Sequence, residues 1–117
     1  MTDASTLAPF HLDEGSEADP SHCLYLLEMD QVADVFEEHD AESNGHGWED
    51  LAESLVRSHM PESVGKLHFG SEGDTFVVTS TDLKALTELA VLLHSAFHNR
   101  ALLSHYIQTA HPRFLDR

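Results

Sequence analysis

The sequence predicts an α+β fold in which two antiparallel hairpins form one sheet that packs against helices, in the order β-β-α-α-β-β-α-α. Two patterns lead to this prediction. Four short segments alternate apolar and polar residues, as strands do, and four others repeat apolar residues at helical spacing. The 117 residues, of which 41% are hydrophobic, suffice for one core. We therefore expect one domain over residues 7–117 after a loose N-terminal stretch, residues 1–6.

The first hairpin is predicted over residues 7–13 and 21–28, which the loop 14–20 connects. Pro9 favours an edge position for the first strand, because proline cannot donate a hydrogen bond to a neighbouring strand. The second strand carries apolar residues on both of its sides. We therefore expect other parts of the protein to cover both faces of it.

A short helix is predicted over residues 30–39, because apolar and acidic residues form opposite stripes along it. The acidic stripe consists of Asp30, Asp34, Glu37 and Glu38. Like charges at this spacing repel each other slightly and so destabilise the helix by a small amount. Binding to a basic partner would explain why the sequence nevertheless carries them. A solvated helix face is the alternative explanation.

A turn-rich loop is predicted over residues 40–47, where we expect Gly45 and Gly47 to supply positive φ angles. The next helix is predicted over residues 48–60, with its apolar stripe in the core. Trp48 begins that stripe, so we expect it in the core and not on a contact surface.

The second hairpin is predicted over residues 64–70 and 75–80, since both segments alternate around a four-residue connection. A long helix follows over residues 82–97, with Ser80 or Thr81 as its N-cap. Its apolar residues cover so much of its circumference that we expect it to be largely buried.

The last helix is predicted over residues 100–110. Asn99 is suited to cap its N-terminus, because the side-chain oxygen of asparagine accepts hydrogen bonds from free backbone N–H groups. We expect Pro112 to limit the helix at its other end.

The charge of the chain is strongly negative and lies in its first half. The formal net charge is -15, and 16 of the 21 acidic residues lie in residues 1–62, where Arg57 is the single base. Binding to nucleic acid requires cations that displace counterions from phosphates, so this composition argues against it. It also argues against docking on an anionic membrane.

Cysteine content and hydropathy predict the cytoplasm as the location. A single cysteine, Cys23, excludes an internal disulfide and a multi-cysteine zinc module. The chain contains no long apolar stretch that would span a membrane, and its first residues lack the features of a signal peptide.

Catalytic and metal-binding motifs find little support in the sequence. His94 and His98 have the spacing at which two histidines on one helix chelate an ion, and His105 is a conceivable third ligand. The His-Glu-x-x-His pattern, a nucleophile elbow, a phosphate loop and a dinucleotide fingerprint are all absent from the sequence. We therefore expect no enzyme and no cofactor, and keep a small histidine metal-binding protein or enzyme as an alternative.

Three segments carry motifs of a known family. They are Val35-Phe36-Glu37 leading through Glu42-Ser43-Asn44-Gly45-His46-Gly47-Trp48 into Leu51-Ala52, the hairpin Leu67-His68-Phe69-Gly70-Ser71-Glu72-Gly73-Asp74-Thr75-Phe76, and Leu86-x-x-Leu89-Ala90. With these segments the chain resembles the immunity protein family fifty-one of bacterial polymorphic toxin systems. Together they place residues 10–107 within the resemblance. The resemblance implies a protein that binds and neutralises a cognate toxin inside the cell, with no catalytic residues of its own.

The negative charge suggests how such binding would work. A toxin that acts on nucleic acid presents a basic cleft, and carboxylates can occupy the places of the phosphates. We therefore favour a basic, nuclease-like toxin as the partner. The expected contact residues are Asp30, Asp34, Glu37, Glu38, Glu42, Glu49 and Asp50. An acidic adaptor for another protein is the alternative in the class of binding modules.

Overall fold

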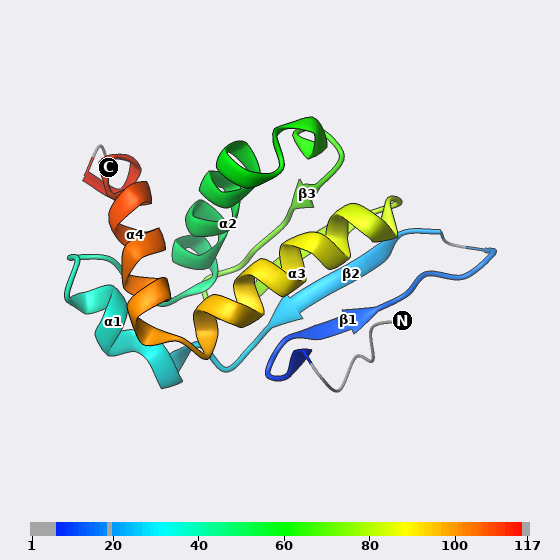
Figure 1. Ribbon diagram of the computed structural model, residues 1–117. Coiled ribbons are helices and arrows are strands. Elements are labelled where there is room, and N and C mark those ends of the chain that lie inside the picture. Colours follow the sequence, from blue (N-terminus) through cyan, green and yellow to red (C-terminus); the bar gives the residue numbers. More distant parts are fainter. Residues whose placement is uncertain (1–6, 19, 116–117) are drawn as a thin grey trace.

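A computed structural model describes residues 7–18 and 20–115, with side chains as far as residue 110, so the predicted loose stretch 1–6 lies outside the described residues. A four-stranded antiparallel sheet forms one layer and the helices form the other (Figure 1). The α+β prediction is therefore confirmed. The elements are β1 (His11–Asp13), β2 (His22–Leu26), the 3-10 helix η2 (Met29–Val32), α1 (Ala33–Glu37), α2 (Gly45–His59), the 3-10 helix η3 (Pro61–Ser63), β3 (His68–Phe69), β4 (Phe76–Ser80), α3 (Leu83–Phe97) and α4 (Arg100–Leu115).

The sheet has the strand order β1-β2-β4-β3, so the two predicted hairpins meet through their longer strands. Residue alternation decides which face is buried. Leu24 lies opposite Leu12 on one side and opposite Val78 on the other, and both Leu24 and Val78 are fully buried. Helices α2 and α3 pack on the strands at this inner face, as Figure 1 shows for α3.

The outer face of the sheet corrects one prediction. Cys23 and Tyr25 point to this side of β2 and are only half-buried, and Leu27 beyond the strand is 53% exposed. The expectation that both faces of β2 are covered is therefore wrong. The tyrosine ring is shielded in part by His11 of β1, whose ring stacks on it at a centroid distance of 4.8 Å.

Four aromatic rings form the centre of the core. Trp48 is fully buried, and its ring lies 5.8 Å from Phe10, 5.2 Å from Phe36 and 6.0 Å from Phe97. The indole Nε1 donates a hydrogen bond to Ser43 Oγ at 3.2 Å, which satisfies its one polar atom. The prediction that Trp48 belongs to the core is confirmed.

Several predicted strands and helices are shorter than their patterns suggested. The first strand begins only at His11, because Leu7 to Phe10 form a turn that the Phe10 N–H closes on the Leu7 carbonyl. Residues 64–67 are not part of the second hairpin, since the N–H groups of Val64 and Lys66 donate within turns and β3 contains only two residues. The predicted helix 30–39 is divided into η2 and α1.

Helix ends follow capping side chains that the periodicity did not locate. Helix α2 begins three residues earlier than predicted, because Asn44 Oδ1 accepts a hydrogen bond from the Gly47 N–H at 2.7 Å. Asp82, and neither Ser80 nor Thr81, caps α3. Its carboxylate accepts from the Ala85 N–H at 3.1 Å, and this bond lowers the pKa of Asp82.

The last helix confirms one capping prediction and corrects another. Asn99 Oδ1 accepts from the Leu102 N–H at 3.1 Å, as expected of an N-cap. The helix continues to Leu115, so Pro112 does not limit it. Proline removes one backbone donor but fits the φ angle of a helix. Within residues 7–18 and 20–115, no helix has the length and apolar character needed to cross a membrane.

Candidate functional site

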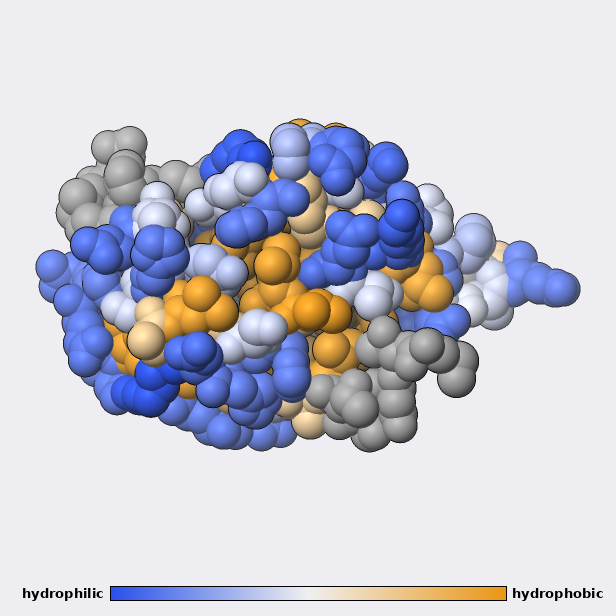
Figure 2. Space-filling view, viewed as in Figure 1, coloured by the Kyte–Doolittle hydropathy of each residue, from blue (hydrophilic) through white to orange (hydrophobic). Residues whose placement is uncertain are grey.

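Five of the seven predicted contact residues are exposed carboxylates on one continuous segment at the α1 end of the molecule (Figure 1). We call them the acidic patch: Asp30 of η2, Asp34 and Glu37 of α1, Glu38 at its end, and Glu42 in the loop that follows. The apolar residues between them, Val32, Val35 and Phe36, are buried in the core and so turn the acids outward. In Figure 2 the surface at this end is mostly hydrophilic.

The members of the acidic patch differ in what they contact. Asp34 forms an ion pair with Arg100 at the start of α4, and Glu42 accepts a hydrogen bond from Asn44 Nδ2 at 2.8 Å. Asp30, Glu37 and Glu38 form no ion pair within the described part of the chain. These three carboxylates are therefore the most available to a cation from outside.

The other two predicted contact residues lie elsewhere. Glu49 is half-buried, and its Oε1 accepts from the Ser71 N–H at 3.1 Å, which ties α2 to the connection between β3 and β4. Asp50 is 4% exposed and lines a hollow of about 350 Å³ under the loop of residues 40–44. We therefore do not include either residue in the acidic patch.

Asp40 is an exposed acid that the sequence reasoning did not include. It lies between Glu38 and Glu42 and lines the same hollow as Asp50. Its backbone adopts a φ of 57°, which is uncommon for a residue other than glycine. Its position between two predicted acids is the signal for it in the sequence.

Gly45 and Gly47 let backbones approach closely at the start of α2. A Cβ atom on Gly45 would lie 1.7 Å from the Glu72 carbonyl oxygen, and one on Gly47 would lie 1.9 Å from that of Glu42. Neither glycine has a positive φ, so the expected reason for them is wrong. Glycine is required at both positions because the start of α2 lies in close contact with the loop of residues 40–44 on one side and with the turn between β3 and β4 on the other.

The histidine pair at the end of α3 forms a contact but not a metal cluster. The rings of His94 and His98 lie 4.6 Å apart, and His98 Nε2 donates to the Ala8 carbonyl at 2.7 Å. The ring of His105 contacts Tyr106. Over the residues that the structure describes, no three His, Cys, Asp or Glu side chains are grouped to hold a metal ion.

The environment of Cys23 does not activate its thiol. Burial first, and the Asp13 carboxylate second, raise the pKa of Cys23 above its usual value. The reactive form of a cysteine is the thiolate, which is therefore disfavoured at neutral pH. Cys23 therefore behaves as a small hydrophobic residue of the sheet.

His94 should make the stability of the fold depend on pH. Burial first, and the neighbouring His98 second, lower the pKa of His94 below its usual value near 6.5. The unfolded chain then takes up a proton at this position at a higher pH than the folded chain does. The contribution of neutral His94 is therefore complete above pH of about 6.5 and is lost as the pH falls below it.

This prediction can be measured with the substitution His94→Gln. The free energy of unfolding of the wild-type protein, relative to that of the variant, should be larger at pH 7.5 than at pH 5, which means that His94 stabilises the fold more at the higher pH. Urea denaturation at a series of pH values gives this difference. A difference that is constant with pH would contradict the prediction.

Comparison with known proteins identifies a family that the chain matches. The chain matches the family Immunity protein 51 over residues 10–112, which is most of its length and includes all three segments on which the resemblance rested. No curated protein and no solved structure matches the chain. The glycines and Trp48 of the first segment are the residues that fix the loop, α2 and the β3–β4 turn against one another. The chain therefore belongs to the Immunity protein 51 family.

Proposed function

We propose that this protein binds a cognate bacterial toxin in the cytoplasm and neutralises it by occlusion, without catalysis of its own. Family membership supports the role of an immunity protein. The exposed acidic patch is the observation that supports a mechanism, because three of its carboxylates lack an ion pair within the described residues. The partner that fits such a surface is a basic, nuclease-like toxin.

Electrostatic attraction would serve this function in two ways. A field from clustered carboxylates raises the rate at which an oppositely charged partner is captured, by about tenfold to a thousandfold. Carboxylates that become desolvated against arginine or lysine in the complex then slow its dissociation. An inhibitor that must capture a toxin before the toxin acts benefits from both effects.

Co-expression tests the proposal directly. The probe is the product of the open reading frame beside the gene of this chain, expressed under a tight promoter in a bacterial host. We expect it to arrest growth when produced alone, and we expect this chain to restore growth and to copurify with it. Another toxin of the same activity, encoded elsewhere, serves as the control and should not be neutralised.

The outcome also separates the proposal from the alternative of an acidic adaptor. An adaptor would copurify with its partner but would leave the partner active. Growth arrest that persists although the two proteins form a complex would therefore contradict neutralisation. The absence of both a complex and rescue would contradict the proposal as a whole.

A further inference from the structure

A groove with an apolar lining lies between the C-terminal end of α2 and the N-terminal part of α3. It has a volume of about 730 Å³, and Met60, Leu83, Val91 and Leu92 are among the residues that line it. Figure 2 shows hydrophobic side chains gathered near the centre of the helical face, with hydrophilic ones around them. A surface of this composition is typical of a binding site for another protein.

Val91 is the side chain of this groove that most needs an explanation. It is 46% exposed in the middle of α3. Among the described residues three large hydrophobic side chains are exposed, and the other two, Leu27 and Val64, lie in connections between elements. An apolar residue on a rigid helix beside an apolar groove can anchor a partner at low entropic cost.

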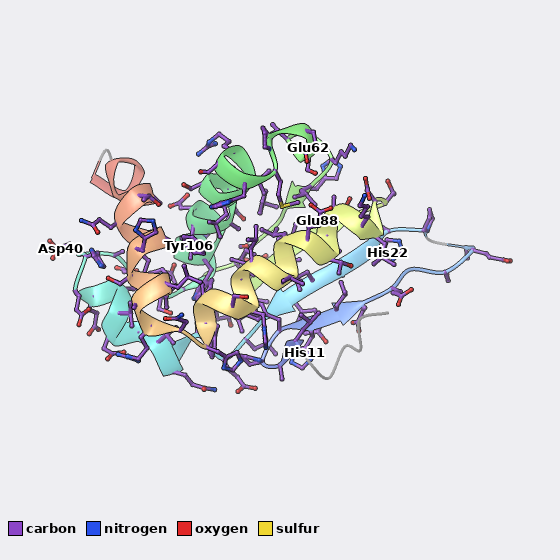
Figure 3. All side chains as sticks on the ribbon, in the orientation of Figure 1. His11, His22, Asp40, Glu62, Glu88 and Tyr106 are labelled. Carbon is purple, nitrogen blue, oxygen red and sulfur yellow. The ribbon has the colours of Figure 1, made fainter. Side chains whose placement is uncertain are left out.

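The charges around the groove indicate the chemistry of that partner. Glu88 lines the groove, and Glu62 lies on η3, which follows directly after the lining residue Met60; both glutamates are labelled in Figure 3. Both carboxylates are exposed, and neither forms an ion pair with a residue that the structure describes. Lys84, one helical turn before Glu88, and His59 are the basic side chains of the lining. Around the groove, two carboxylates therefore outnumber the one ammonium group. This local negative charge, on a chain with a net charge of -15, complements a basic partner.

We propose that this groove receives an apolar side chain of the toxin, with a lysine or arginine of the same toxin segment between Glu62 and Glu88. This inference rests on the proposed function, because the toxin is the partner. The acidic patch on η2 and α1 lies apart from the groove (Figure 1), so the two surfaces have different roles. The patch acts on encounter first and on dissociation through its desolvated carboxylates, whereas the buried anchor acts on dissociation alone.

The test uses surface-immobilised full-length protein and, as the probe, the neighbouring open reading frame product with its activity abolished by mutation. Val91→Asp places a charge in the groove and should raise the dissociation rate at least about tenfold, with little change in the association rate. Leu27→Asp is the matched control, because Leu27 is similarly exposed but does not line the groove. It should bind as the wild-type protein does. Thermal unfolding of both variants checks that they fold.

A second set of variants tests the charge of the occupant. Glu62→Gln combined with Glu88→Gln should weaken binding several-fold at low salt and less at high salt. Lys84→Gln should leave binding unchanged or strengthen it. The opposite pattern, with Lys84 required and the glutamates dispensable, would mean an acidic occupant and would overturn the proposal.

The remaining outcomes separate this inference from the function on which it rests. Wild-type kinetics for Val91→Asp, in a complex that neutralises the toxin, would overturn the groove and leave the proposed function intact. A wild-type chain that neither binds nor neutralises the probe would overturn both. Dimerisation of the free protein that Val91→Asp abolishes, measured by sedimentation, would show that a second copy occupies the groove and would also overturn the proposal.

Discussion

Replacing Gly45 by alanine should destabilise the protein by about 3 kcal/mol or more, a large part of the total stability of a domain of this size. The new methyl group would lie 1.7 Å from the Glu72 carbonyl oxygen and 2.5 Å from that of Thr75. Both obstacles are backbone atoms of one tight turn, so no flexible side chain can move aside. The Gly45 N–H also donates to the Gly73 carbonyl at 3.1 Å, and a displaced turn would lose this bond.

Urea or thermal unfolding followed by circular dichroism measures the effect. We expect a midpoint at least about 10 °C below that of the wild-type protein. Gly70→Ala is the matched control, because a Cβ atom on Gly70 would meet nothing within 4 Å and its φ is not positive. This variant should remain within about 1 kcal/mol of the wild type. Equal stability of the two variants would contradict close backbone approach as the reason for Gly45.

Local patterns predicted the order of the elements and the composition of the core. The inner stripe of α2 begins with Trp48, and the alternation along β4 places Phe76 and Val78 inside, as the structure shows. Such patterns report which side of one helix or strand is apolar, and they need no knowledge of what packs against it. The long helix over residues 83–97 was therefore also located almost to the residue.

Features that depend on contacts between distant segments could not be read in the same way. Asp50 reads as an exposed residue of an acidic helix start, yet the loop of residues 40–44 folds beside it and it is buried. Gly45 reads as a turn residue, although its role depends on the β3–β4 turn. The groove beside Val91 could not be predicted from local patterns either, since the whole second hairpin separates α2 and α3 in the sequence.

The acidic patch was predicted in part, for an identifiable reason. Helical spacing predicted correctly that Asp30, Glu37 and Glu38 face outward, because the apolar residues between them are buried and define the inner side. The pairing of Asp34 with Arg100 was not predicted, because α4 is far away in the sequence. Charge counting alone cannot tell an acid that already has a partner in the fold from one that is available for a toxin.

That distinction determines how the acidic patch should be tested. Replacing Asp30, Glu37 and Glu38 together by lysine should lower the rate of association with the inactivated toxin about a hundredfold at low salt. Asp34 is left unchanged because a lysine there would face Arg100, and Glu42 is left unchanged because it contacts the Asn44 cap of α2. The variant should therefore keep the stability of the wild-type protein while its surface charge is reversed. Stopped-flow mixing at several salt concentrations measures the rates.

The matched control makes the same change in net charge at the opposite end of the molecule. Asp13, Glu14 and Glu17 lie on β1 and the loop before β2, which Figure 1 places far from α1, and all three are exposed. If the attraction arises locally, replacing them by lysine should slow association by less than about tenfold at a salt concentration of about 0.1 M, because charges beyond a Debye length of about 10 Å are then screened. Equal slowing by both triple variants would mean that the toxin responds to the net charge of -15 alone. The patch would then be a solvated helix face, and the specific contact would have to lie elsewhere on the protein.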